Sequence, residues 1–251
     1  MFIDSHAHLY GMDVDGVIAR AKEALVDFII CPATNPQSIL ESIQIAEAHD
    51  EVYACIGFHP EDIQKFDKEE ENFLIEMAKK PKVVAIGEIG LDYHMGGEDK
   101  ELQRYAFERQ IVIANKLNLP IVVHIRDAMG DAIEILERNA ALLTNGGVIH
   151  CYSGSIEDAK RFMKLGLDFT IGGVCTFKNA ARLPEVIKFL PLERILLETD
   201  TPYLAPVPLR GTVNEPKNIP IIAQKIAEFK GENVEKVAKI TTENAKRVFR
   251  I

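Results

Sequence analysis

The amino-acid sequence predicts an α/β protein with the (β/α)8 architecture of a TIM-type barrel. We expect a single domain over residues 1–251, with extra helices at its C-terminal end. Short apolar segments alternate with longer amphipathic segments along the chain. The short segments number about eight, as a closed barrel requires. The length of 251 residues is also close to the roughly 250 residues typical of such barrels.

The short apolar segments are rich in β-branched residues, which favour strands. They lie at residues 2–8, 28–33, 52–58, 83–88, 121–125, 148–151, 169–172 and 195–199. Strands that alternate with helices form βαβ units, and these units build a parallel sheet.

The segments between these strands have the amphipathic pattern of helices. Clear examples are residues 101–117, 128–138, 156–165 and 183–190. Two further helical patterns follow the last strand, at residues 219–229 and 234–249. We expect this pair to pack on the outside and to finish the last repeat.

An open, doubly wound sheet is the alternative architecture for alternating strands and helices. The usual nucleotide fingerprints of open sheets are GxGxxG after the first strand and GxxxxGK[ST]. Neither motif occurs in this sequence. The closed barrel is therefore the preferred prediction.

The charge balance argues against one class of function. The chain carries 38 acidic and 29 basic residues, for a formal net charge of −9. An acidic protein repels polyanions at long range, so broad binding of duplex nucleic acid through a basic face is not expected. Bound metal ions can still create a local positive site.

Cysteine spacing and the N-terminal residues predict the compartment. The four cysteines, at positions 31, 55, 151 and 175, form no CxxC pair, so we expect core thiols in a reducing environment. Neither a signal peptide nor an apolar run long enough to span a bilayer is evident. A cytoplasmic location without membrane contact is the expectation, and no obligate protein partner is evident.

Six imidazole and carboxylate side chains fall at the ends of predicted strands. They are His6, His8, Glu88, His124, His150 and Asp200. Barrel active sites form where the carboxyl ends of the strands converge, so we expect these side chains to cluster. Imidazoles and carboxylates suit zinc, manganese or a related divalent ion. Six ligands exceed one tetrahedral site, and two ions bridged by a carboxylate and a water fit better.

One histidine at a strand end is usually an ordinary polar residue, but four histidines, a glutamate and an aspartate in this order have a parallel in a known family. Residues 4–9 (DSHAHL) resemble the opening of the amidohydrolase superfamily. Later segments resemble the successive signatures of TatD-type deoxyribonucleases. These segments are GFHP at 57–60, GEIGLDY at 87–93, VHIR at 123–126, HCYSG at 150–154, ETDTPYL at 198–204, PLRG at 208–211 and NEP at 214–216.

The resemblance implies how the six residues divide between two divalent ions. His6, His8 and Asp200 hold one ion, His124 and His150 hold the other, and Glu88 bridges them. The metals are zinc, manganese or magnesium. Asp200 and Glu88 are the expected catalytic residues. We hypothesise that a water between the ions loses its proton to Asp200, and that the hydroxide attacks phosphorus in line.

Five neighbouring residues are candidates for substrate contact or for orienting the ligands. We expect His59 to contact a substrate phosphate or to support a ligand. Arg126 clamps a phosphate or forms a structural ion pair. Glu198 lies on the same strand face as Asp200 and is expected to orient ligands or water. Tyr93 stacks on a base or packs its loop, and Arg210 lies in a loop suited to function.

Three classes of function remain open at this point. The leading hypothesis is a metal-dependent exonuclease that acts on DNA, either single strands or 3′ ends. The second is a hydrolase that cleaves a small ester, amide or aminoacyl ester at the same site, because one fold hosts many chemistries. The third is a non-catalytic binding protein, which the complete ligand set argues against.

Overall fold

The computed structural model describes residues 1–94 and 99–251 of the chain. Its strands form one parallel sheet of eight, in the order of the sequence, and confirm the predicted barrel. The strands are β1 (Phe2–Asp4), β2 (Val26–Pro32), β3 (Val52–Ile56), β4 (Val83–Asp92), β5 (Ile121–Arg126), β6 (Gly147–Ile149), β7 (Leu167–Ile171) and β8 (Ile195–Leu197).

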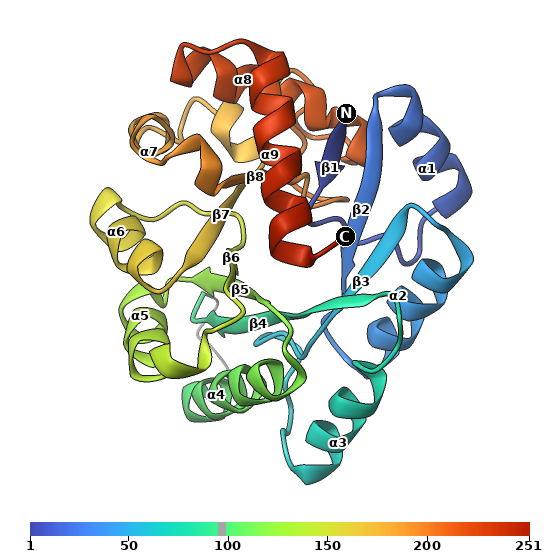
Figure 1. Ribbon diagram of the computed structural model, residues 1–251, viewed down its shortest axis with the longest axis vertical. Helices are drawn as coiled ribbons and strands as arrows, with labels where there is room; N and C mark the ends of the chain where they lie inside the picture. Colours follow the sequence, from blue (N-terminus) through green and yellow to red (C-terminus); the bar gives the residue numbers. More distant parts are fainter. Residues whose placement is uncertain (95–98) are drawn as a thin grey trace.

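Helices follow the strands in turn and surround them, as Figure 1 shows. They are α1 (Val14–Glu23), α2 (Pro36–Ala48), α3 (Lys68–Met77), α4 (Lys100–Leu117), α5 (Met129–Arg138), α6 (Ile156–Lys164), α7 (Leu183–Phe189), α8 (Ile219–Lys230) and α9 (Val234–Phe249). Among the residues that the structure describes, no helix combines the length and apolar character needed to cross a bilayer.

Two strands differ in length from the prediction. β1 ends at Asp4, so His6 and His8 follow the strand instead of ending it. β4 continues to Asp92, so the expectation that Glu88 ends this strand was wrong. The apolar pattern did not predict this extension, because Gly90 interrupts it. Its φ of +144° and the 2.0 Å that would separate an added Cβ from the carbonyl oxygen of His124 both require glycine here.

Strand side chains form two separate apolar layers. Ile29 and Cys31 of β2, like Ile56 of β3, point outward and join the large cluster that includes the helices. Ile30 and Cys55 point inward and join a smaller cluster inside the barrel. The period of two along each strand therefore divides the core between the barrel interior and the layer beneath the helices.

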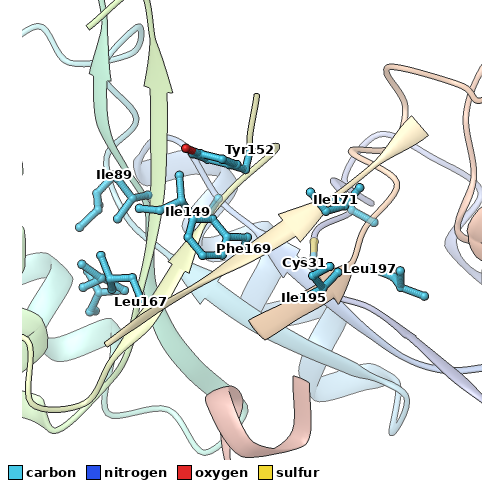
Figure 2. Close-up of a cluster of buried hydrophobic side chains, with 14 of the residues drawn as sticks. Cys31, Ile89, Ile149, Tyr152, Leu167, Phe169, Ile171, Ile195 and Leu197 are labelled. Carbon is cyan, nitrogen blue, oxygen red and sulfur yellow. The ribbon is translucent and has the colours of Figure 1, made fainter. Parts of the chain in front are cut away.

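The outer layer is well packed beside β6, β7 and β8. Figure 2 shows Phe169 of β7 close to Ile149 and Tyr152, with Ile195 and Leu197 of β8 beyond it. The rings of Phe169 and Tyr152 pack edge to face with centroids 4.8 Å apart, a favoured geometry for aromatic pairs. This packing fixes the strands that precede the last three loops of the barrel mouth.

The last helix has a different place from the one predicted. α8 follows β8 and finishes the last repeat, as expected, but α9 lies across the barrel in Figure 1. Ala245, Val248 and Phe249 of α9 share the inner cluster with Ile3 and Leu196, each the second residue of its strand. α9 therefore covers the end of the barrel at which the strands begin, and leaves the opposite end open.

Hydrogen bonds between the first and last strands complete the barrel. The backbone N–H of Asp200 donates to the carbonyl of His6 over 2.9 Å. The carboxylate of Asp4, which is fully buried, accepts hydrogen bonds from the backbone N–H of Thr199 at 3.0 Å and from its hydroxyl at 2.5 Å. The segments that carry His6 and Asp200 are thereby held side by side.

A buried aspartate connects α9 to the sheet. Asp168 of β7 is 1% exposed and accepts hydrogen bonds from two arginines. Arg194, just before β8, lies 2.8 Å from one carboxylate oxygen, and Arg247 of α9 lies 2.6 Å from the other. Both arginines are partly exposed, so water can replace some of their hydrogen bonds if the aspartate is removed.

We predict that Asp168→Asn lowers the free energy of unfolding by about 2 kcal/mol, since hydrogen bonds to a charged group contribute ~1.5–3 kcal/mol. Urea denaturation followed by circular dichroism measures the change. Glu137→Gln, which breaks an exposed pair with Arg161, is the matched control and has a much smaller effect, because exposed ion pairs contribute little to stability. Equal effects of the two substitutions would contradict the role given to Asp168.

Candidate metal centre

Glu88 lies at the centre of the barrel mouth, among four histidines. One carboxylate oxygen, Oε2, is 3.3 Å from Nε2 of His6 and 3.8 Å from Nε2 of His8. The other, Oε1, is 2.9 Å from Nδ1 of His124 and 3.7 Å from Nε2 of His150. Each oxygen of Glu88 thus faces a different pair of these imidazoles, and Nε2 of a fifth histidine, His59, lies 3.6 Å from Oε1.

Asp200 reaches both pairs of histidines from the far side of the centre. Its Oδ1 lies 3.9 Å from Nε2 of His6 and 3.8 Å from Nε2 of both His8 and His150. Its backbone φ is +59°, an uncommon conformation for a residue other than glycine. The structure therefore brings all six predicted residues together, although they are far apart in the sequence.

A bulge in β4 directs Glu88 into this centre. β4 pairs with β5 through Ile86 and Ile121, and then through Ile89 and Val123. One extra residue is thus accommodated on β4 between these pairs, at the position of Glu88. Such bulges turn side chains at barrel rims and near active sites.

The charges of the centre depend on one another. Burial raises the pKa of Glu88, but His150, His6 and His59 outweigh this effect and hold its pKa well below the usual range. Burial lowers the pKa of His150, yet Glu198 and Glu88 raise it to about 10. A buried carboxylate keeps its charge only beside cations, so this centre calls for protons or metal ions.

Two carboxylates hold the histidines from behind. Nδ1 of His150 lies 2.7 Å from Oε2 of Glu198, and Nε2 of His124 lies 2.8 Å from Oδ2 of Asp92. Glu198 was expected to have this kind of role, whereas sequence reasoning missed Asp92. The sequence feature that could have identified Asp92 is its place in the GEIGLDY segment, four positions after Glu88.

The donor set suits divalent cations. Among residues 1–94 and 99–251, donor atoms within 4.8 Å of one another come from three groups. The groups are His6 with Glu88 and His150; His6 with His8 and Asp200; and His59 with Glu88 and His124. The Nε2 atoms of His6 and His8 lie 3.3 Å apart, and a shared cation would satisfy both. Carboxylates behind the imidazoles are the usual support for metal-bound histidines.

His59 lies closer to the centre than a purely peripheral residue. It is 7% exposed, and its Nε2 is 3.6 Å from Oε1 of Glu88. Its Nδ1 accepts a hydrogen bond of 3.2 Å from the backbone N–H of Glu61. The side chain can therefore contact either a cation or a substrate phosphate at the edge of the centre.

A cavity of about 920 Å³ opens above the centre. Arg126 lines it, as the prediction of a phosphate contact requires. Tyr93 does not line it, and its hydroxyl instead donates to Asp131 at 2.8 Å. Arg210 also lies outside the lining, with its guanidinium carbon 4.3 Å from the ring centroid of Phe177.

Comparison with known proteins gives the family. Residues 3–250 match the family model described as TatD related DNase. The chain belongs to this TatD family. It is 43% identical to YabD of Bacillus subtilis, named an uncharacterized metal-dependent hydrolase, over 100% of both chains. It is 36% identical to the 3′-5′ ssDNA/RNA exonuclease TatD of Pantoea ananatis, over 96% of this chain and 94% of the relative.

Solved structures agree with this assignment. The crystal structure of YJJV, a TatD homolog from Escherichia coli, superposes with a TM-score of 0.92 at 31% identity, covering 100% of this chain and 98% of that one. As a member of the TatD family with a clustered donor set, the protein is a metal-dependent hydrolase that acts on ester bonds.

Within this TatD protein, Glu198 offers a direct test of how the histidines are held. We predict that Glu198→Gln lowers the affinity for zinc by about 10–100-fold, because such supporting carboxylates orient the imidazole and raise its basicity. Competition with a chromophoric chelator measures the affinity, and thermal melting checks the fold. Glu243→Gln, on the exposed face of α9, is the control. An unchanged zinc affinity in Glu198→Gln would contradict this role.

Proposed function

We propose that this protein is an exonuclease that uses two divalent ions to hydrolyse phosphodiester bonds of single-stranded nucleic acid, from the 3′ end. One observation carries the proposal: the two oxygens of Glu88 face different pairs of histidines. A carboxylate between two sets of donors is the arrangement that paired metal ions use in phosphodiester hydrolysis.

Each residue of the centre has a role in this proposal. His6, His8 and Asp200 would hold one ion, His124 and His150 the other, and Glu88 both. When bound, such ions lower the pKa of water and neutralise charge on the phosphoryl oxygens. Imidazole ligands favour zinc, while manganese and magnesium also serve this chemistry.

Asp200 would act as the base. Its Oδ1 faces histidines of both sets, so it would be placed to accept a proton from a water held by the ions. The water oxygen forms a bond to phosphorus, the bond from phosphorus to the 3′ oxygen breaks, and the leaving oxygen takes the proton that Asp200 accepted. His59 would stabilise the substrate phosphate from the opposite edge.

The choice of substrate rests on charge and on the TatD relatives. The net charge of −9 disfavours wrapped duplex and favours an end that enters the cavity. Relatives named 3′-5′ ssDNA/RNA exonuclease support the polarity and the single strand. The four free cysteines support a reducing compartment, the cytoplasm in this proposal. No obligate protein partner is needed, since this chain alone supplies the donor set.

We predict that Asp200→Asn abolishes hydrolysis, because the amide cannot accept the proton from water. The assay follows 3′-labelled and 5′-labelled single-stranded oligonucleotides with protein stripped of metal and then restored with magnesium, manganese or zinc. Wild-type protein should shorten the strand stepwise from the 3′ end only when metal is present. Turnover by a metal-loaded Asp200→Asn variant would overturn the assignment.

Wild-type protein that binds metal fully and cleaves no oligonucleotide would contradict the exonuclease proposal. That result would move the proposal to the alternative substrate, a small ester, amide or aminoacyl ester at the same centre.

We predict that Arg126→Ala lowers kcat/KM about 10-fold, mainly through KM, since a hydrogen bond to a charged group contributes ~1.5 kcal/mol or more. Arg126 lines the cavity and can contact a phosphate next to the cleaved one. Steady-state kinetics on a short oligonucleotide measures the effect, with the exposed Arg182→Ala as control. A change confined to kcat would argue against a binding role.

A further inference from the structure

An exposed aromatic side chain stands at the rim of the cavity. Tyr203 follows Asp200 by three residues and is 63% exposed. It lines the cavity together with Pro202 and Leu204, of which Leu204 is 37% exposed. An exposed aromatic ring that lines a cavity beside the catalytic centre is placed to contact a ligand bound there.

The backbone beneath this ring is fixed. The N–H of Tyr203 donates to the carbonyl of Asp200 over 2.7 Å, and its carbonyl accepts a hydrogen bond of 2.8 Å from Nδ2 of Asn214. Asn214 is fully buried and also accepts from Nδ2 of Asn218 at 2.8 Å. These hydrogen bonds therefore fix the main chain of Tyr203 before any ligand binds, and its side chain lines the cavity.

The other walls of the cavity differ in chemistry from this one. Glu61 and Asp62, after β3, line one part of it, and Arg126, at the end of β5, lines another. Acidic side chains repel phosphates and Arg126 attracts them. After β8, beyond Asp200, the wall carries Pro202, Tyr203 and Leu204, so its outer part suits the flat, uncharged part of a nucleotide.

We propose that the ring of Tyr203 stacks on the base of the terminal nucleotide. This inference rests on the proposed exonuclease function and extends it to the recognition of the base. Stacking accepts every base, because each has a π-face. A base inside a strand is covered by its neighbours on both faces, whereas the terminal base has one open face, which can lie on the ring while its phosphodiester reaches the centre.

The test combines a protein change with a matching substrate change. Two single-stranded oligonucleotides are used, which are identical except that the nucleotide at the digested end carries thymine in one and no base in the other. Wild type, Tyr203→Ala, Tyr203→Phe and Tyr105→Ala are compared in the metal-loaded form. Tyr105 is a matched exposed tyrosine on α4, 52% exposed and outside the cavity lining.

We predict that Tyr203→Ala lowers kcat/KM on the thymine substrate by about 10- to 100-fold, mostly through KM, as expected for loss of one base–aromatic stack. Removing the base should cost wild type a similar factor, and should cost Tyr203→Ala little more. Tyr203→Phe and Tyr105→Ala should retain the wild-type preference for the base.

Two results would overturn the inference while leaving the exonuclease intact. They are wild-type kinetics in Tyr203→Ala, and an equal loss from Tyr203→Ala on both substrates. Failure of metal-loaded wild type to cleave either substrate would instead overturn the proposed function, and this inference with it.

Discussion

The buried negative charge of Glu88 is the constraint on which the rest of this site depends. The residue is 3% exposed, and a carboxylate so deep is stable only when cations surround it. Five imidazoles approach its two oxygens, and Asp92 and Glu198 support two of them from behind. The negative charge of Glu88, Asp92, Glu198 and Asp200 makes the barrel mouth suitable for binding cations.

The barrel holds this cluster in place through features far from the chemistry. The network of Asp4 and Thr199 fixes the first and last strands side by side, and so sets His6 beside Asp200. At the opposite end, α9 covers the barrel with Val248 and Phe249. The barrel core is therefore covered at the end where the strands begin, and the loops at the end where the strands finish form the cavity.

The sequence predicts the fold and the clustering of these six side chains well, because both follow from local patterns. His124 and His150 come after short apolar runs, and their strands converge by the geometry of a barrel. The full length of β4 is difficult to predict, because Glu88 and Gly90 interrupt its apolar pattern. The bulge that directs Glu88 inward depends on how β4 pairs with β5. Long-range features such as this register leave little local signal in a sequence.

The same reason explains the other differences. The packing of α9 across the barrel depends on which surface remains uncovered once eight repeats close, and an amphipathic pattern does not specify that surface. Asp92 becomes notable only when His124 lies beside it. Tyr93 and Tyr203 both follow predicted strands, yet Tyr93 donates its hydroxyl to Asp131 whereas Tyr203 lines the cavity. The side-chain environment that separates them exists only in the folded chain.

The most direct test of a centre with paired ions is anomalous diffraction from crystals of the manganese-loaded or zinc-loaded protein. Two peaks are predicted, one beside His6, His8 and Asp200 and one beside His124 and His150, with an oxygen of Glu88 directed at each. A single peak at full occupancy, or peaks that leave Glu88 without a cation, would contradict the bridging role that unites this account.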